Sequence, residues 1–236
     1  MANFRTHVTV AAVGSGLLST VCLGAGVASP GEVMTLSVVG TLGGILPDID
    51  SDHSTPIQIL FTVLGFVTAF LVVFAHVDQY STLELWLLWL FVYVFIRYPT
   101  WLVFTRFTVH RGIFHSLAAG LFFGLLMTNL SYVVFACRPL LAWIIGSFVC
   151  IGYILHLLLD ELFSVDFMST RIKRSFGTAF KVIDYGNLGT SAAMVGSVCL
   201  LYLIAPEADS FADIFLNEET YQSMSARFWP SAGLFR

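Results

Sequence analysis

The chain has 236 residues, of which 57% are hydrophobic and 11% are charged, and its formal net charge is -4. A soluble globular domain carries a much larger share of charged residues, so this composition excludes that class. Nothing in it suggests nucleic-acid binding, and the length allows about six or seven membrane spans. We therefore predict an all-α protein, a polytopic membrane helix bundle of about six to seven transmembrane or re-entrant helices.

Seven apolar stretches approach or exceed the roughly 20 residues that a helix needs to cross a bilayer. They cover residues 7–28, 33–47, 56–77, 83–105, 113–135, 139–163 and 189–206. The second is short, rich in glycine and ends at Pro47, which predicts a tilted, partly re-entrant helix whose end is buried against protein. The first resembles a signal peptide, but only Arg5 precedes it as a basic residue, so we expect it to be retained. Residues 1–206 then form a membrane-embedded domain and residues 207–236 a polar C-terminal tail.

Alternating the direction of these stretches places the loops 48–53, 106–112 and 164–188 on the side of the N-terminus. Basic residues collect on that side, whereas the short loops of the other side hold only Arg138, so the first side is predicted to be cytoplasmic. The basic residues are Arg5, Arg106, Arg111, Arg171, Lys173, Arg174 and Lys181. The same threading places five of the six histidines at the cytoplasmic face, and only His76 at the opposite interface with water.

Histidines and aspartates recur at the helix ends of that face, where ionisable groups are costly and usually functional. They are His7, Asp48, Asp50, His53, His110, His115, His156 and Asp160. His156 and Asp160 are spaced i, i+4 and share a helix face, whereas the neighbouring Glu161 points about 100° away. Eight nitrogen and oxygen ligands without a thiol predict a divalent metal, with zinc first and manganese or iron as alternatives, and suffice for two ions.

Each part of this pattern also has a plainer interpretation. The His156 and Asp160 pair fits a buried hydrogen bond that caps a helix, and the Asp48 to Asp52 run fits a turn that caps the next one. The histidines of the run His110 to His115 fit the membrane interface equally well when taken alone. The combination favours the metal site, because carboxylates at the mouth of an apolar bundle need a counter-charge.

The ordered motifs resemble those of a known family. They are His7, Leu46-Pro47-Asp48-Ile49-Asp50, His110-Arg111-Gly112-Ile113-Phe114-His115-Ser116 and His156-Leu157-Leu158-Leu159-Asp160. Over about residues 1–205 the chain resembles the YdjM-like, LexA-regulated and inner-membrane-associated metal-dependent hydrolases. The resemblance implies a helical protein of the bacterial inner membrane with hydrolase activity. It also implies a distant similarity to zinc-dependent phospholipase C and P1-type nucleases, helical enzymes with clustered zinc ions.

The predicted chemistry is metal-assisted hydrolysis of a phosphoester, on a lipid or lipid-linked substrate. Asp50 is the predicted general base, and Arg111, fixed between two motif histidines, is the predicted phosphate clamp. Further phosphate contacts are predicted from Arg171, Lys173 and Arg174, although a basic stretch at this position equally fits contact with anionic headgroups.

Two other functions use the same ligands. A transporter would bind a metal ion or protons there, and the short glycine-rich second span favours it. Against it, the ligands gather at one face, with no second set near the bilayer midplane. A non-catalytic scaffold with a structural metal is the third reading, and it predicts loss of the fold on chelation without ester turnover.

Overall fold

The computed structural model describes residues 3–50, 55–100, 102, 113–163, 165–166, 171–172 and 181–228. Within these ranges the chain is almost entirely helical, which confirms the predicted all-α membrane bundle. The strands found there are two residues each, β1 (Val165–Asp166) and β2 (Arg171–Ile172), and they pair antiparallel.

Each predicted apolar stretch coincides with one helix. These helices are α1 (Phe4–Gly24), α2 (Pro30–Gly43), α3 (Thr55–Ala75), α4 (Thr82–Phe95), α6 (Leu117–Val133), α7 (Pro139–Leu162) and α8 (Leu188–Leu203). A π-helical turn, η2 (Ile96–Thr100), extends α4. Among the described residues, α1, α4 with η2, and α7 are long and apolar enough to cross a membrane, and α6 and α8 are apolar but shorter.

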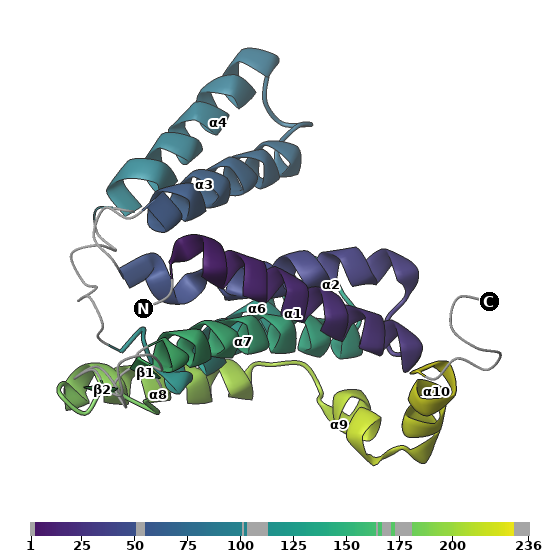
Figure 1. Cartoon of the computed structure of the whole chain (residues 1–236). Helices are drawn as coiled ribbons and strands as arrows, with labels where there is room; N and C mark the ends of the chain where they lie inside the picture. Colours follow the sequence, from purple (N-terminus) through teal and green to yellow (C-terminus); the bar gives the residue numbers. More distant parts are fainter. Residues whose placement is uncertain are drawn as a thin grey trace. The chain divides into compact units, whose positions relative to one another are not determined.

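The chain divides into two compact units, Met1–Pro47 with Ile113–Arg236, and Asp48–Gly112. In the first unit α7 is central and packs against α1, α2 and α6, while α8 packs against α6 (Figure 1). One hydrophobic cluster surrounds Tyr153 and Leu157 of α7, and another surrounds Leu36 of α2 and Phe148 of α7. Both clusters depend on α7, which is the most buried of the three candidate spans.

Polar residues that suit helix caps mark where these helices begin. The side chains of Asn3, Ser116 and Asn187 accept hydrogen bonds from backbone N–H groups in the first turns of α1, α6 and α8. Ser29 and Glu32 form a capping box at the start of α2. Such caps satisfy donors that have no partner within the helix, so the boundaries follow from local sequence.

The end of α2 differs from the prediction. The helix stops at Gly43, and Leu46–Asp50 forms a separate 3-10 helix, η1, so Pro47 lies inside η1 instead of ending α2. Near this end α2 packs closely on α7, because a Cβ atom at Gly152 of α7 would overlap the carbonyl oxygen of Gly40. Small residues thus let α2 lie directly against α7, with its end buried, as helices in membranes often pack.

The second unit contains the antiparallel pair α3 and α4. Its contact is aromatic: the rings of Phe66 and Phe70 lie 5.8 and 5.7 Å from that of Trp89, edge to face. His76, predicted at the interface away from the metal ligands, follows α3, and its Nδ1 lies 2.8 Å from the carbonyl oxygen of Val72. Most of α4 is exposed, as lipid contact would require.

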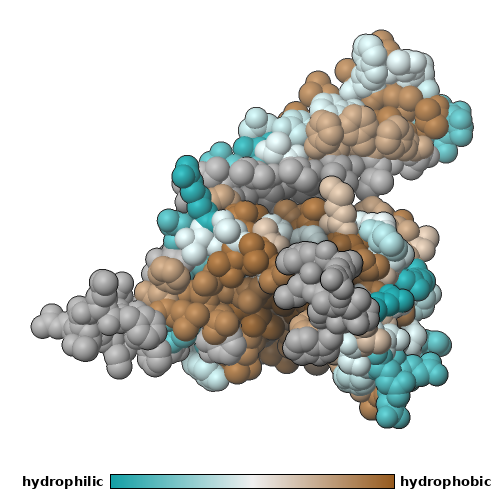
Figure 2. Space-filling model, turned by 45° about the vertical axis from the view of Figure 1, so that its right-hand side comes forward, coloured by the Kyte–Doolittle hydropathy of each residue, from teal (hydrophilic) through white to brown (hydrophobic). Residues whose placement is uncertain are grey.

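The predicted polar tail contains two helices, α9 (Asp209–Leu216) and α10 (Glu218–Phe228). They pack against α7 and α1 respectively, at the end of the first unit away from the N-terminus (Figure 1). Phe211 and Ile214 join the hydrophobic cluster around Phe148. Hydrophobic residues cover much of the face seen in Figure 2, and hydrophilic residues gather at its edges.

Candidate metal centre

Four predicted ligands meet at one end of the first unit. His7 lies in the first turn of α1, and His115 directly precedes the cap of α6. His156 and Asp160 lie one turn apart near the end of α7. All four are at most 3% exposed. Charged groups are almost never so buried unless they are paired or bind metal, so this cluster is a candidate site.

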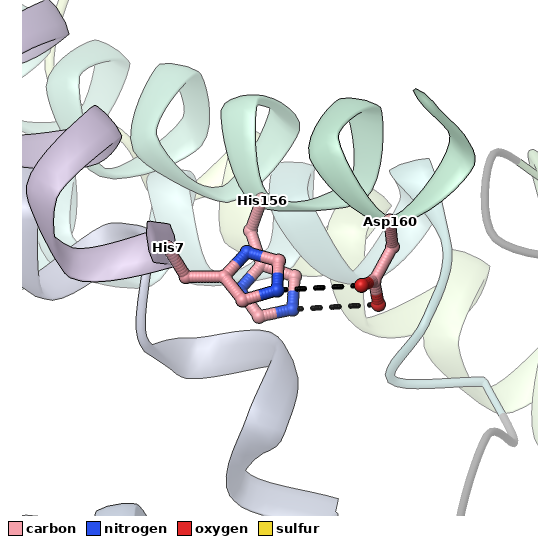
Figure 3. A group of neighbouring side chains, drawn as sticks. All are labelled: His7, His156 and Asp160. Carbon is pink, nitrogen blue, oxygen red and sulfur yellow. Dashed lines mark ion pairs between the residues drawn. The ribbon is translucent and has the colours of Figure 1, made fainter. Parts of the chain in front are cut away.

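Asp160 is the centre of the cluster (Figure 3). Its Oδ1 lies 3.3 Å from Nε2 of His7, and its Oδ2 lies 3.8 Å from Nε2 of both His115 and His156. The rings of His7 and His156 stack with centroids 3.8 Å apart. Two ligands held about 2.1 Å from one zinc ion at the tetrahedral angle lie about 3.4 Å apart. The observed spacing therefore matches ligands that share an ion.

The carboxylate of Asp160 is not satisfied by hydrogen bonds. Both of its oxygens are buried, and neither accepts a hydrogen bond of ordinary geometry within the described part of the chain; the same holds for Nδ1 of His7. A buried acceptor without a donor costs about 1–3 kcal/mol, and more when it is charged. A cation among these atoms would remove that cost.

The ring of His156 is fixed by the backbone directly after α2. Its Nδ1 lies 2.7 Å from the carbonyl oxygen of Gly44. Since a carbonyl only accepts, Nδ1 carries a proton, and in the neutral form of the ring the lone pair on Nε2 faces Asp160. Two electron-rich atoms then face each other, an arrangement that a cation stabilises. Metal-ligating histidines usually donate their other N–H in this way.

His115 is held through the residues beside it. The hydroxyl of Tyr153, on α7, donates a hydrogen bond to the carbonyl oxygen of Phe114. On the other side, N–H groups of Leu117 and Ala118 donate to the carbonyl oxygens of Lys181 and Val182, at 2.9 and 3.1 Å. The start of α6 is therefore fixed to α7 and to the segment before α8, which fixes His115 as well.

The remaining predicted site residues lie in η1, in β2 or outside the described part of the chain. Asp48 is half-buried in η1. It is the first residue of the second unit and directly follows the buried Pro47 in the sequence. Asp50 also lies in η1, and Arg171 in β2, but their side chains are outside the description. His53, His110, Arg111, Lys173 and Arg174 lie outside the described residues. Glu161 is half-buried and is not among the gathered ligand atoms, as its helix position predicted.

Several positioning groups were not predicted from the sequence, namely Tyr153, the Gly44 carbonyl and the pairing of residues 116–118 with 181–182. A weak signal existed for Gly44, because neighbouring glycines permit close approach of the backbone to another helix. The backbone pairing has no signature in the sequence that we can identify.

The donor set suits a transition metal. Three imidazoles and one carboxylate, with no thiolate among the described ligands, match the ligands of zinc and of other first-row metals. The three atoms of His7, His156 and Asp160 lie within 4.8 Å of one another, close enough to hold one ion.

Comparison with known proteins places the chain in a family. Residues 1–208 match the model of a family described as YdjM inner membrane protein. No curated protein and no solved structure matches the chain. The match covers α1 to α8 and all four clustered ligands, and it agrees with the resemblance drawn from the motifs. The chain therefore belongs to the YdjM inner membrane protein family.

Proposed function

We propose that the chain is a membrane-bound metal-dependent hydrolase that cleaves a phosphoester on a lipid or lipid-linked substrate. One observation carries the metal part of this proposal. The Nε2 lone pair of His156 and the unsatisfied carboxylate of Asp160 face each other inside a membrane protein, with two further imidazoles beside them. A bound cation would stabilise this arrangement, because it would compensate the buried carboxylate and accept the lone pair of the imidazole.

In this proposal His7, His115, His156 and Asp160 hold a divalent ion, with zinc preferred over manganese or iron. A bound ion of this kind supplies Lewis acidity, which activates water and stabilises charge that develops on a phosphoryl group. Asp160 neutralises part of the ion's charge, and Gly44 keeps the His156 ring aimed at it. Asp48, Asp50, His53 and His110 remain the other predicted ligands, and all eight together suffice for two ions. Asp50 is the predicted general base if it is not fully committed to metal, and Arg111 is the predicted phosphate clamp.

The position of the cluster supports a lipid substrate. It lies at the ends of α1 and α7, which are both long and apolar enough to cross a bilayer. A site at the end of a spanning helix lies near the headgroup region, where phosphoesters of lipids are found. We place it at the cytoplasmic face of a multi-pass protein, on the distribution of arginine and lysine in the sequence.

The test begins with metal content. The full chain, purified in detergent, is analysed for bound metals as the wild type, as Asp160→Asn and as the control Glu161→Gln. We expect stoichiometric metal in the wild type and the control and a loss of metal in Asp160→Asn. No stoichiometric metal in the wild type, even after reconstitution, would overturn the proposal.

The second step separates hydrolysis from transport. The metal-loaded protein is assayed for phosphate-ester cleavage on phospholipids and lipid phosphates, and in sealed vesicles for entry of zinc or protons. A hydrolase releases product in detergent and moves no ions. Ion entry without product would assign the same ligands to a transporter, and metal binding without either would assign them to a structural site.

A further inference from the structure

A cavity of about 480 Å³ lies in the first unit, between α1, α7, α9 and α10. It falls in the range of about 300–1,000 Å³ that is typical of small-molecule sites. Its walls are formed mainly by apolar side chains, including Leu18, Phe148, Ile151, Phe215 and Met224, and its few polar groups are thiols and hydroxyls. No charged residue lines it, so among the described residues its walls suit a hydrocarbon chain.

This cavity is separate from the metal cluster. On α1 the cluster uses His7, whereas the cavity uses Leu18 to Ala25. At 1.5 Å per helical residue, His7 and Val21 lie about 21 Å apart along α1. The cavity therefore belongs to the opposite end of the bundle.

A smaller cavity of about 260 Å³ adjoins it and shares Val21 and Met224 with it. This second cavity is lined by Arg227 of α10, which is exposed and uses Nη1 to donate to the carbonyl oxygen of Leu23 at 3.3 Å. A guanidinium has five N–H donors, so most of its capacity is left for an anion. By contrast, Arg138, near the start of α7, already pairs with Glu32 at 3.3 Å.

The helices that close the larger cavity are anchored. The indole N–H of Trp143 donates to the carbonyl oxygen of Pro206 at 3.0 Å, and its ring stacks on Phe211 of α9. The hydroxyl of Tyr221 in α10 donates to the carbonyl oxygen of Phe215. Both α9 and α10 begin after residue 208, where the family match ends. The walls that they supply thus lie outside the matched region.

We propose that the two adjoining cavities bind one anionic phospholipid, with an acyl chain in the larger cavity and the phosphate at Arg227. The apolar walls suit the acyl chain, and the positive charge of Arg227 favours a headgroup with a net negative charge over a zwitterionic one, whose cation it repels. The site does not depend on the proposed hydrolase activity, and its lipid is a resident ligand instead of the substrate.

The test is native mass spectrometry of the delipidated full chain in detergent, titrated with phosphatidylglycerol and with phosphatidylcholine of the same acyl chains. Ser147→Phe fills the larger cavity, and Ser197→Phe makes the same change on α8, away from both cavities. Arg227→Gln removes the proposed headgroup contact, and Arg138→Gln removes a guanidinium that is already paired.

We expect one saturable phosphatidylglycerol per wild-type chain, bound at least about tenfold more tightly than phosphatidylcholine, as a charge-assisted contact predicts. Ser147→Phe should abolish this site, and Arg227→Gln should reduce phosphatidylglycerol binding to that of phosphatidylcholine. Both controls should bind like the wild type. Equal binding of the two lipids by the wild type would overturn the headgroup assignment, and unchanged binding by Ser147→Phe would overturn the site itself.

Discussion

Nδ1 of His156 and the carbonyl oxygen of Gly44 lie 2.7 Å apart, so the backbone directly after α2 sets the direction of a proposed metal ligand on α7. The contact joins residues 112 positions apart. It fixes which ring nitrogen carries a proton as well as the orientation of the ring, because a carbonyl oxygen accepts a hydrogen bond only from a nitrogen that bears a proton. The geometry of the proposed metal centre therefore depends on how closely α2 and α7 pack.

Asp160→Asn should remove the response of the protein to chelators. With metal at 100 times its dissociation constant, binding stabilises the wild type by about 2.7 kcal/mol, or roughly 5–10 °C in Tm for a chain of this size. We expect that loss when EDTA is added to the wild type and no shift in the variant. Thermal unfolding in detergent measures both, with Glu161→Gln as the control that should behave like the wild type.

Gly152→Ala should loosen the contact between α2 and α7. The added methyl would overlap the Gly40 carbonyl oxygen and crowd the Gly44 nitrogen, so we expect a loss of about 1–3 kcal/mol in stability. Metal affinity should fall too, because the Gly44 carbonyl is displaced. Gly196→Ala on α8 meets open space and should be neutral or stabilising by up to about 1 kcal/mol. Equal effects of the two changes would contradict the packing argument.

Tyr153→Phe should weaken metal binding without touching a ligand. The lost hydroxyl holds the Phe114 carbonyl beside His115, and groups that orient metal ligands are worth about 10–100-fold in affinity. We expect at least a tenfold weaker zinc affinity by competition with a chelating dye. Tyr202→Phe, at an exposed position on α8, is the matched control and should leave the affinity unchanged.

Glu32→Gln should change the pH dependence of stability. Burial opposes ionisation of Glu32, but hydrogen bonds from Ser29 and the charge of Arg138 outweigh it and lower the pKa below its ordinary 4.5. A carboxyl group with a lowered pKa stabilises the fold above about pH 4.5, and this stabilisation is lost as the pH falls through the lower pKa of the folded state. Gln keeps the capping box. The free energy of unfolding of the wild type should therefore exceed that of the variant by less than about 1 kcal/mol at neutral pH. A difference in Tm that persists at low pH would contradict this assignment.

The convergence of the four ligands was predictable because it needs only the number and direction of the helices. His7 begins one helix, His115 precedes another, and His156 with Asp160 ends a third, so alternating threading brings them to the same end. The i, i+4 spacing of His156 and Asp160 likewise fixes their common face. These features depend on local sequence and on helix order alone.

The details that orient the ligands depend instead on long-range packing. The Gly44 contact and the backbone pairing of Ser116 with Lys181 join distant parts of the chain by groups that every residue carries. The end of α2 was also not predicted correctly: the sequence predicted it at Pro47, whereas the helix stops at Gly43. Proline marks where a helix cannot continue, but close contact with α7 is seen only in the folded chain.

The pairing of His7 with Asp160 has a consequence for biogenesis, because the two residues are separated by almost two thirds of the chain. At about 5–20 residues per second, Asp160 is synthesised roughly 8–30 s after His7. Throughout that interval α1 carries a lone histidine without its carboxylate, which is a poor metal ligand by itself. In the proposed site, metal binding that uses both His7 and Asp160 therefore follows the synthesis of α7.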